Sequence, residues 1–168
     1  KNLNFKLDIV FISPLRRTLQ TFDKIKDTFN GTKFIVTELL REKVNNPNTH
    51  FGHSVSNLKK LFKEIDSLNF DYLTKEMWWT HEKDDDYDHL YYLDNFIKED
   101  IKQFELRIML QLIWFIFREE KNGCFISHSK VFSSIHKNEK KAIHGGQYIL
   151  ENKNLLDFIA NSINEFVI

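Results

Sequence analysis

Residues 9–21 read IVFISPLRRTLQT and join an apolar run to a polar turn that carries two adjacent arginines. The apolar run, within residues 8–12, predicts a buried strand. The segment 15–29 predicts an amphipathic helix, because its apolar residues recur at helical spacing. The turn therefore lies at the carboxyl end of a strand, where α/β proteins bind ligands. Two arginines with neighbouring hydroxyl groups at such a place suit an anion, most often phosphate.

The same turn also has a purely structural interpretation. Ser13 is a common N-cap residue, and Pro14 is common where a helix begins. Arg16 and Arg17 could simply be solvated. Because arginines near a helix start are common, the turn by itself does not establish a phosphate site.

The composition is that of a globular domain. The chain has 168 residues, which suits one domain over 1–168, and 16 phenylalanines supply much of a core. Its 24 basic and 24 acidic residues cancel, which argues against a nucleic-acid partner but leaves a small local anion site open. The single cysteine, Cys124, excludes an intrachain disulfide and a multi-cysteine zinc site, and it favours a reducing compartment.

The sequence contains no obvious membrane signal. Its longest apolar stretch, at about residues 109–117, is interrupted by Gln111 and is too short to span a bilayer. No signal-peptide pattern occurs at the start. We therefore expect a cytoplasmic protein without a membrane partner.

The remaining pattern alternates strands and helices. Further strands are predicted at 33–37 and 124–127, with a loop at 38–48 and an irregular excursion at 66–93 that could partly cover a cleft. Further helices are predicted at 54–65, 96–121, 131–136 and 155–166. This order predicts an α/β fold, a three-layer sandwich with a mainly parallel sheet flanked by helices.

Three chemically active side chains lie just past the predicted strands. Arg17 follows the first strand, Glu42 lies in the loop after the second, and His128 follows the third. The carboxyl ends of parallel strands meet at one edge of a sheet. There an arginine can neutralise a phosphate, a carboxylic acid can protonate a leaving oxygen, and a histidine can add charge or nucleophilicity. The pattern predicts phosphoryl chemistry.

Four segments, spread from Asp8 to about Glu139, resemble the histidine phosphatase superfamily, also called the phosphoglycerate mutase-like family. Residues 13–21 resemble its SPLxRxxQT helix start, and residues 39–42 resemble its LRE segment. Glu99 and Arg107, with Trp114 beyond them, resemble its E…R…FLxWL helix. Residues 126–129 resemble the end of its VSHGG strand. The four segments occur in the family's order.

The resemblance implies a role for each matching residue. Arg17 would bind the transferred phosphoryl group, and Glu42 would donate a proton to the leaving group. His128 would be the second active-site histidine, holding phosphoryl oxygens together with Ser129 and neighbouring amides. The implied activity is hydrolysis of a small phosphomonoester without a cofactor or metal. A phosphoglycerate mutase is the alternative.

The sequence departs from the family in two places. The family's nucleophile is a histidine in an Arg-His-Gly motif on an earlier strand, and no Arg-His-Gly occurs here. Ser129-Lys130 stands where the family usually has Gly-Gly, so these side chains could crowd the phosphate, or Lys130 could add a cation. Either the nucleophile and its strand lie upstream, which we expect, or the protein is a catalytically inactive phosphate-binding or interaction module. The chain as given should not complete a phosphohistidine cycle.

Several other features favour structural roles. Arg107, on an otherwise apolar helix face, is expected to pair with a carboxylate. The acidic run 84–86 lacks the spacing of a calcium loop and is expected to be solvated. Residues 78–79, both tryptophan, are expected to pack, and Cys124 is expected to be a buried apolar residue.

Overall fold

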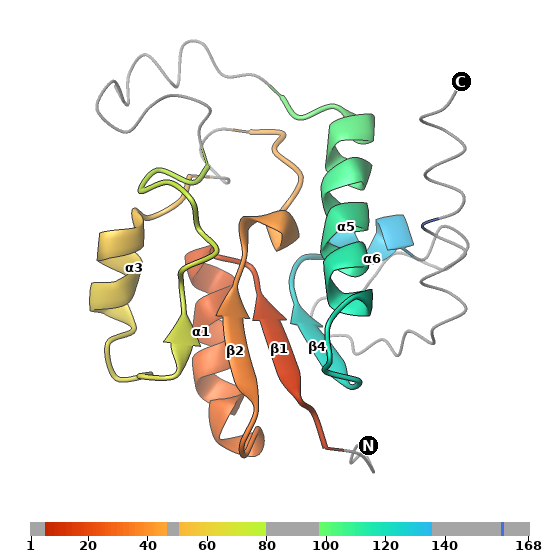
Figure 1. Cartoon of the computed structure of the whole chain (residues 1–168). Helices are drawn as coiled ribbons and strands as arrows, with labels where there is room; N and C mark the ends of the chain where they lie inside the picture. Colours follow the sequence, from red (N-terminus) through yellow and green to blue (C-terminus); the bar gives the residue numbers. More distant parts are fainter. Residues whose placement is uncertain (1–5, 47–50, 80–97, 136–158, 160–168) are drawn as a thin grey trace.

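The computed structural model describes residues 6–46, 51–79, 98–135 and Ile159 (Figure 1). Its centre is a parallel sheet in the order β3-β2-β1-β4. The strands are β1 (Ile9–Ile12), β2 (Lys33–Val36), β3 (Leu68–Asn69) and β4 (Gly123–Ile126). Every pairing between these strands is parallel. The predicted parallel α/β sheet is confirmed.

Helices cover both faces of this sheet, as the predicted three-layer sandwich requires. One face carries α1 (Arg16–Ile25) and α3 (Val55–Leu61), and the other carries α5 (Ile101–Ile116) and α6 (Ser129–Ile135) (Figure 1). All residues of β1 are fully buried, as expected for a central strand that packs on both sides.

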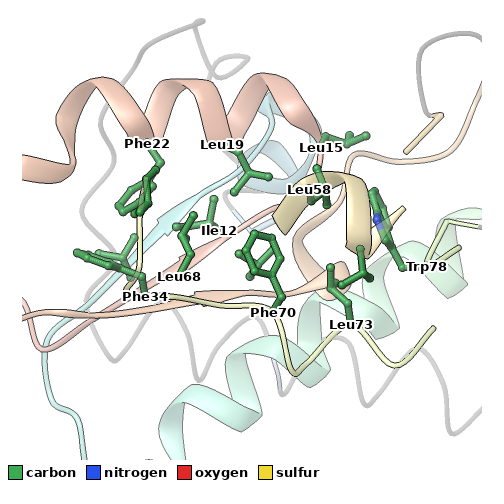
Figure 2. Close-up of a cluster of buried hydrophobic side chains, with 14 of the residues drawn as sticks. Ile12, Leu15, Leu19, Phe22, Phe34, Leu58, Leu68, Phe70, Leu73 and Trp78 are labelled. Atoms are coloured by element: carbon green, nitrogen blue, oxygen red, sulfur yellow. The ribbon is translucent and has the colours of Figure 1, made fainter. Parts of the chain in front are cut away.

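Alternate residues of β1 belong to two separate cores. Val10 and Ile12 join the core beneath α1 and α3, where side chains from both helices and from the 68–73 segment converge (Figure 2). Ile9 and Phe11 join the core beneath α5 and α6. There the Phe11 ring packs against Trp114 and Phe125, with centroids 5.1 and 5.5 Å away. The two cores hold β1 from both sides, and they therefore fix the position of the turn that follows it.

The helix boundaries differ from their predictions. α1 ends at Ile25, and a 3-10 turn (Lys26–Thr28) completes the predicted 15–29 segment. α5 begins after Asp100, whose Oδ1 accepts a hydrogen bond from the Gln103 amide at 2.9 Å, so it is shorter than the predicted 96–121. Ile101 and Ile116 are 53% and 41% exposed, since both lie in terminal turns of the helix.

Other differences concern short or irregular segments. α3 ends at Leu61 instead of residue 65. The two-residue β3 lies within the predicted 66–93 excursion. The predicted helix 155–166, apart from Ile159, and the acidic run 84–86 lie outside the described residues. Among the residues that are described, no helix is both long and apolar enough to cross a membrane.

Candidate functional site

Three adjacent strands end at the same level of the sheet. The register pairs Ile12 of β1 with Val36 of β2 and with Ile126 of β4. The next residue of each strand is a hydroxyl residue: Ser13, Thr37 and Ser127. The segments that lead to Arg17, Glu42 and His128 therefore start side by side, as the sequence predicts.

The turn after β1 is bonded to the turn after β4. The Ser13 hydroxyl lies 2.8 Å from Nε2 of His128. Ser13 is fully buried and His128 is 7% exposed, so this imidazole is held inside the protein rather than at its surface. The Thr18 hydroxyl lies 2.5 Å from the Leu15 carbonyl and 2.8 Å from the Ser13 carbonyl, and it braces the turn from α1.

The N-cap interpretation of Ser13 is wrong. The N-cap of α1 is Leu15, which has extended backbone angles and no side-chain cap bond. The Ser13 hydroxyl is only 3.5 Å from the Leu15 amide, whereas its contact with His128 is much shorter. A buried imidazole nitrogen needs a polar partner, and that demand outweighs the local capping preference.

Arg17 is the second residue of α1 and is exposed overall. Partial desolvation lowers the pKa of its guanidinium, while the nearby Glu42 carboxylate acts in the opposite direction. The group still remains protonated at physiological pH, as arginine does in proteins. Arg17 and Glu42 follow different strands, but they lie close enough to interact electrostatically.

The loop after β2 carries Glu42. It begins with a 3-10 turn, η2 (Glu38–Leu40), capped by the Thr37 hydroxyl, which accepts a hydrogen bond from the Leu39 amide at 3.3 Å. The Ser127 hydroxyl donates a 2.6 Å hydrogen bond to the Leu40 carbonyl, which ties this loop to the end of β4. Glu42 is half-buried, and its Oε1 accepts a hydrogen bond from the Lys43 amide at 3.1 Å.

Arg107 of α5 pairs with a carboxylate, as predicted, and the carboxylate is Glu99. Its Nε and Nη2 donate to Oε1 and Oε2 of Glu99, both at 2.8 Å. Nη1 donates to the carbonyls of Leu39 and Arg41 at 2.7 and 2.9 Å. Nη2 also lies 3.4 Å from the Glu42 carbonyl. The Val44 amide donates to Glu99 Oε2 at 3.1 Å, so the pair contacts the loop on both sides of Glu42 and at Glu42 itself.

The half-buried carboxylates of Glu99 and of Glu38, in η2, have opposite pKa shifts. Burial raises the pKa of Glu99, but hydrogen bonds and charge from Arg107, together with Arg41, outweigh it and hold that pKa below its usual range. Glu38 has a raised pKa because burial dominates over the attraction of nearby cations. The sequence alone predicts no role for Glu38, because a glutamate in a loop is usually solvated.

The residues after His128 are less enclosed. Ser129, predicted to contact phosphate, is the half-buried first residue of α6. Lys130 is exposed and lines, with Lys43, Glu105 and Ser133, a hollow of about 500 Å³ between α5 and α6. Ser129 therefore lies at the predicted edge, and Lys130 adds a cation next to it.

The remaining candidates have structural surroundings. Trp78 and Trp79 are buried and pack edge to face, with ring centroids 5.5 Å apart, which confirms their predicted packing role. Cys124 is half-buried, and burial raises its thiol pKa to about 11, so it is not a thiolate nucleophile at neutral pH. Within the described part of the chain, no group of three or more His, Cys, Asp or Glu residues could hold a metal ion.

Comparisons with known proteins give no family. No protein-family model matches the chain, and no curated protein matches it significantly. The assignment of a function therefore depends on the residues of the site and on the four motifs described above.

Proposed function

We propose that this chain carries the phosphoryl-binding part of a histidine phosphatase-type site, and that the full-length protein hydrolyses a small phosphomonoester. The observation that carries the proposal is the joining of three strand ends: Ser13 to His128, and Ser127 to the loop of Glu42. An arginine, a carboxyl group and a histidine at one edge of a parallel sheet are suited to an anionic substrate.

Arg17 would bind the phosphoryl group. Its guanidinium can donate two parallel hydrogen bonds to phosphate oxygens, and its position at the start of α1 leaves it open to solvent. His128 would stand behind the phosphoryl group, with its ring orientation fixed by the Ser13 hydroxyl. Both groups would counter the negative charge that moves during phosphoryl transfer.

Glu42 would protonate the leaving oxygen. Its carboxyl group is half-buried and lies in the electrostatic field of Arg17, close to where that arginine would hold a phosphate. In the proposed first step a histidine attacks phosphorus, the P–O ester bond breaks, and Glu42 gives its proton to the departing alkoxide. In the second step water attacks phosphorus, loses a proton to Glu42 and releases phosphate and the histidine.

Because no Arg-His-Gly occurs in residues 1–168, we propose that the nucleophile lies in a segment encoded upstream of Lys1. Among the described strands β4 pairs with β1, and a further parallel strand on its other edge would extend the sheet. A strand added there would end beside His128, on the side away from Ser13. An Arg-His-Gly motif after an apolar strand in the upstream sequence would support this assignment.

Full-length protein tests the proposal directly. We expect it to hydrolyse an aryl phosphate or a sugar phosphate and to form a phosphoenzyme that can be labelled and trapped. R17M should lower kcat/KM about a hundredfold or more, since it removes a principal phosphate ligand. R16M is the matched control: the neighbouring arginine is also exposed, and its loss should change kcat/KM less than about twofold. Absence of turnover on a broad panel of phosphomonoesters would refute the hydrolase.

Two other functions give different results in the same assay. A mutase would transfer the phosphoryl group to a second hydroxyl of a phosphoglycerate instead of releasing inorganic phosphate. A catalytically inactive phosphate-binding module is favoured by the lack of any Arg-His-Gly in the sequence. For the module, phosphate at a hundred times its Kd should stabilise the fold by about 2.7 kcal/mol while turnover stays absent. If R17M abolishes neither turnover nor stabilisation by phosphate, the site itself is refuted.

A further inference from the structure

We propose that Arg107 and Glu99 are positioning residues: they fix the loop that carries Glu42 and so determine where its carboxyl group meets the leaving oxygen. The proposal rests on the function proposed above. It concerns two residues that would not touch the substrate and that act through the backbone of a third.

The guanidinium of Arg107 is fully used. Its five N–H groups match the five contacts described above: two with the Glu99 carboxylate and three with loop carbonyls. Arg107 is 7% exposed, so these bonds are sheltered from water. An arginine that served only to hold α5 on the core would not need to direct three contacts at one loop.

Glu99 holds the same loop from its far end. Its Oε2 accepts a hydrogen bond from the Val44 amide at 3.1 Å, and its own amide donates to the Val44 carbonyl at 2.9 Å. Arg41, also in the loop, lies 3.6 Å from Glu99 Oε1. Backbone groups of Leu39, Arg41, Glu42 and Val44 are therefore all bound by one ion pair.

Beyond η2, this loop needs such support because it has no regular structure of its own. Residues 41–46 lie outside any helix or strand, so no ladder of backbone hydrogen bonds defines their path. The contact from Glu42 Oε1 to the Lys43 amide is local and moves with the loop. α5 is anchored in the core by Phe104, Ile108 and Leu112, all buried. Through its hydrogen bonds to the loop carbonyls, Arg107 fixes the loop of the proposed proton donor to this helix.

The test compares esters whose leaving groups differ in basicity. A dinitrophenolate leaves without protonation, whereas an alkoxide requires a proton from Glu42. In the full-length protein, R107K keeps the charge but loses the planar fork of donors. We expect R107K to lower kcat/KM for an alkyl phosphate about ten- to a hundredfold, and for dinitrophenyl phosphate less than about threefold. E42Q should lower kcat/KM for the alkyl phosphate further than R107K does, again with a much smaller effect on dinitrophenyl phosphate.

Arg118 supplies the matched control. It follows the opposite end of α5, pairs with Glu120 at 2.9 Å and lies over the Trp114 ring, far along the helix from the Glu42 loop. R118K should leave the ratio of the two kcat/KM values unchanged. If R107K does not fold, E99Q provides the same comparison, since it removes the charge of Glu99 with little change of shape.

The outcomes separate the two proposals. If the wild-type protein hydrolyses both esters but R107K and E99Q lower both rates equally, the positioning role is refuted and the hydrolase stands. If the wild-type protein hydrolyses neither these esters nor any other phosphomonoester of a broad panel, the proposed function is refuted, and with it the catalytic purpose of the pair. A selective loss on the alkyl ester, absent in R118K, supports the positioning role.

Discussion

Removing the Ser13 hydroxyl tests the link that joins the ends of β1 and β4. Ser13→Ala deletes one buried hydrogen bond of 2.8 Å to Nε2 of His128 and adds no bulk. A buried polar atom that loses its partner typically costs about 1–3 kcal/mol. For a chain of 168 residues, each kcal/mol corresponds to about 2–4 °C in Tm, so S13A should melt about 2–12 °C lower.

The assay is reversible unfolding in urea and by heat at pH 8. Ser67→Ala is the control, since Ser67 is exposed, and its stability should stay within about 0.5 kcal/mol of wild type. A double-mutant cycle with His128→Leu isolates the pair, and we expect a coupling energy of about 1 kcal/mol. Equal stability of S13A and S67A, or a coupling energy near zero, would refute the claim that this bond organises the site.

Three further changes test the framework around the site. Hydrogen bonds from Arg118 and Lys33 lower the pKa of Glu120 to about 2. Its contribution to stability is therefore present above about pH 4.5 and is lost as the pH falls toward 2. In thermal melts, the Tm of E120Q should depend less on acid pH than the Tm of wild type does. Gln111 is fully buried, and neither of its side-chain polar atoms has a partner in the described part of the chain, so Q111M should raise the free energy of unfolding by about 1 kcal/mol; a loss of stability would show that the amide has an unrecognised partner. A Cβ at Gly52 would clash with two buried tryptophan rings, so G52A should destabilise the fold by about 1–3 kcal/mol in urea unfolding, and an unchanged midpoint would contradict this packing.

The sequence predicted the sheet edge because its strands carry a strong signal. Ile9–Ile12 is a continuous apolar run, and such runs are typical of strands buried on both faces, so the edge holding Arg17 and His128 could be placed without a structure. β3 gave no comparable signal, since two residues are too few to show a period. The ends of α5 were misplaced because apolar residues occur on several faces of this helix and conceal where it begins and ends.

The interior of the site could not be predicted in the same way. Ser13 and His128 are 115 positions apart, and local rules assign Ser13 to helix capping, so only the assembled sheet reveals their bond. The link between Arg107 and the Glu42 loop is equally non-local: the sequence indicates that a buried arginine needs a carboxylate, but not that its remaining donors hold a loop. Such contacts depend on how segments meet in space, which spacing along the chain does not encode.

The energetic cost of the buried polar groups favours a functional edge over a purely structural one. Moving an ion pair such as Arg107–Glu99 out of water costs several kcal/mol per ion, and well-packed apolar residues often serve stability equally well. The same holds for a buried histidine bonded to a buried serine. In this protein both costly arrangements lie beside the carboxyl ends of the same three strands, and each fixes a loop that carries a proposed active group. A scaffold domain would have no reason to place them together, whereas a site that must orient Glu42 and His128 around one phosphoryl group would.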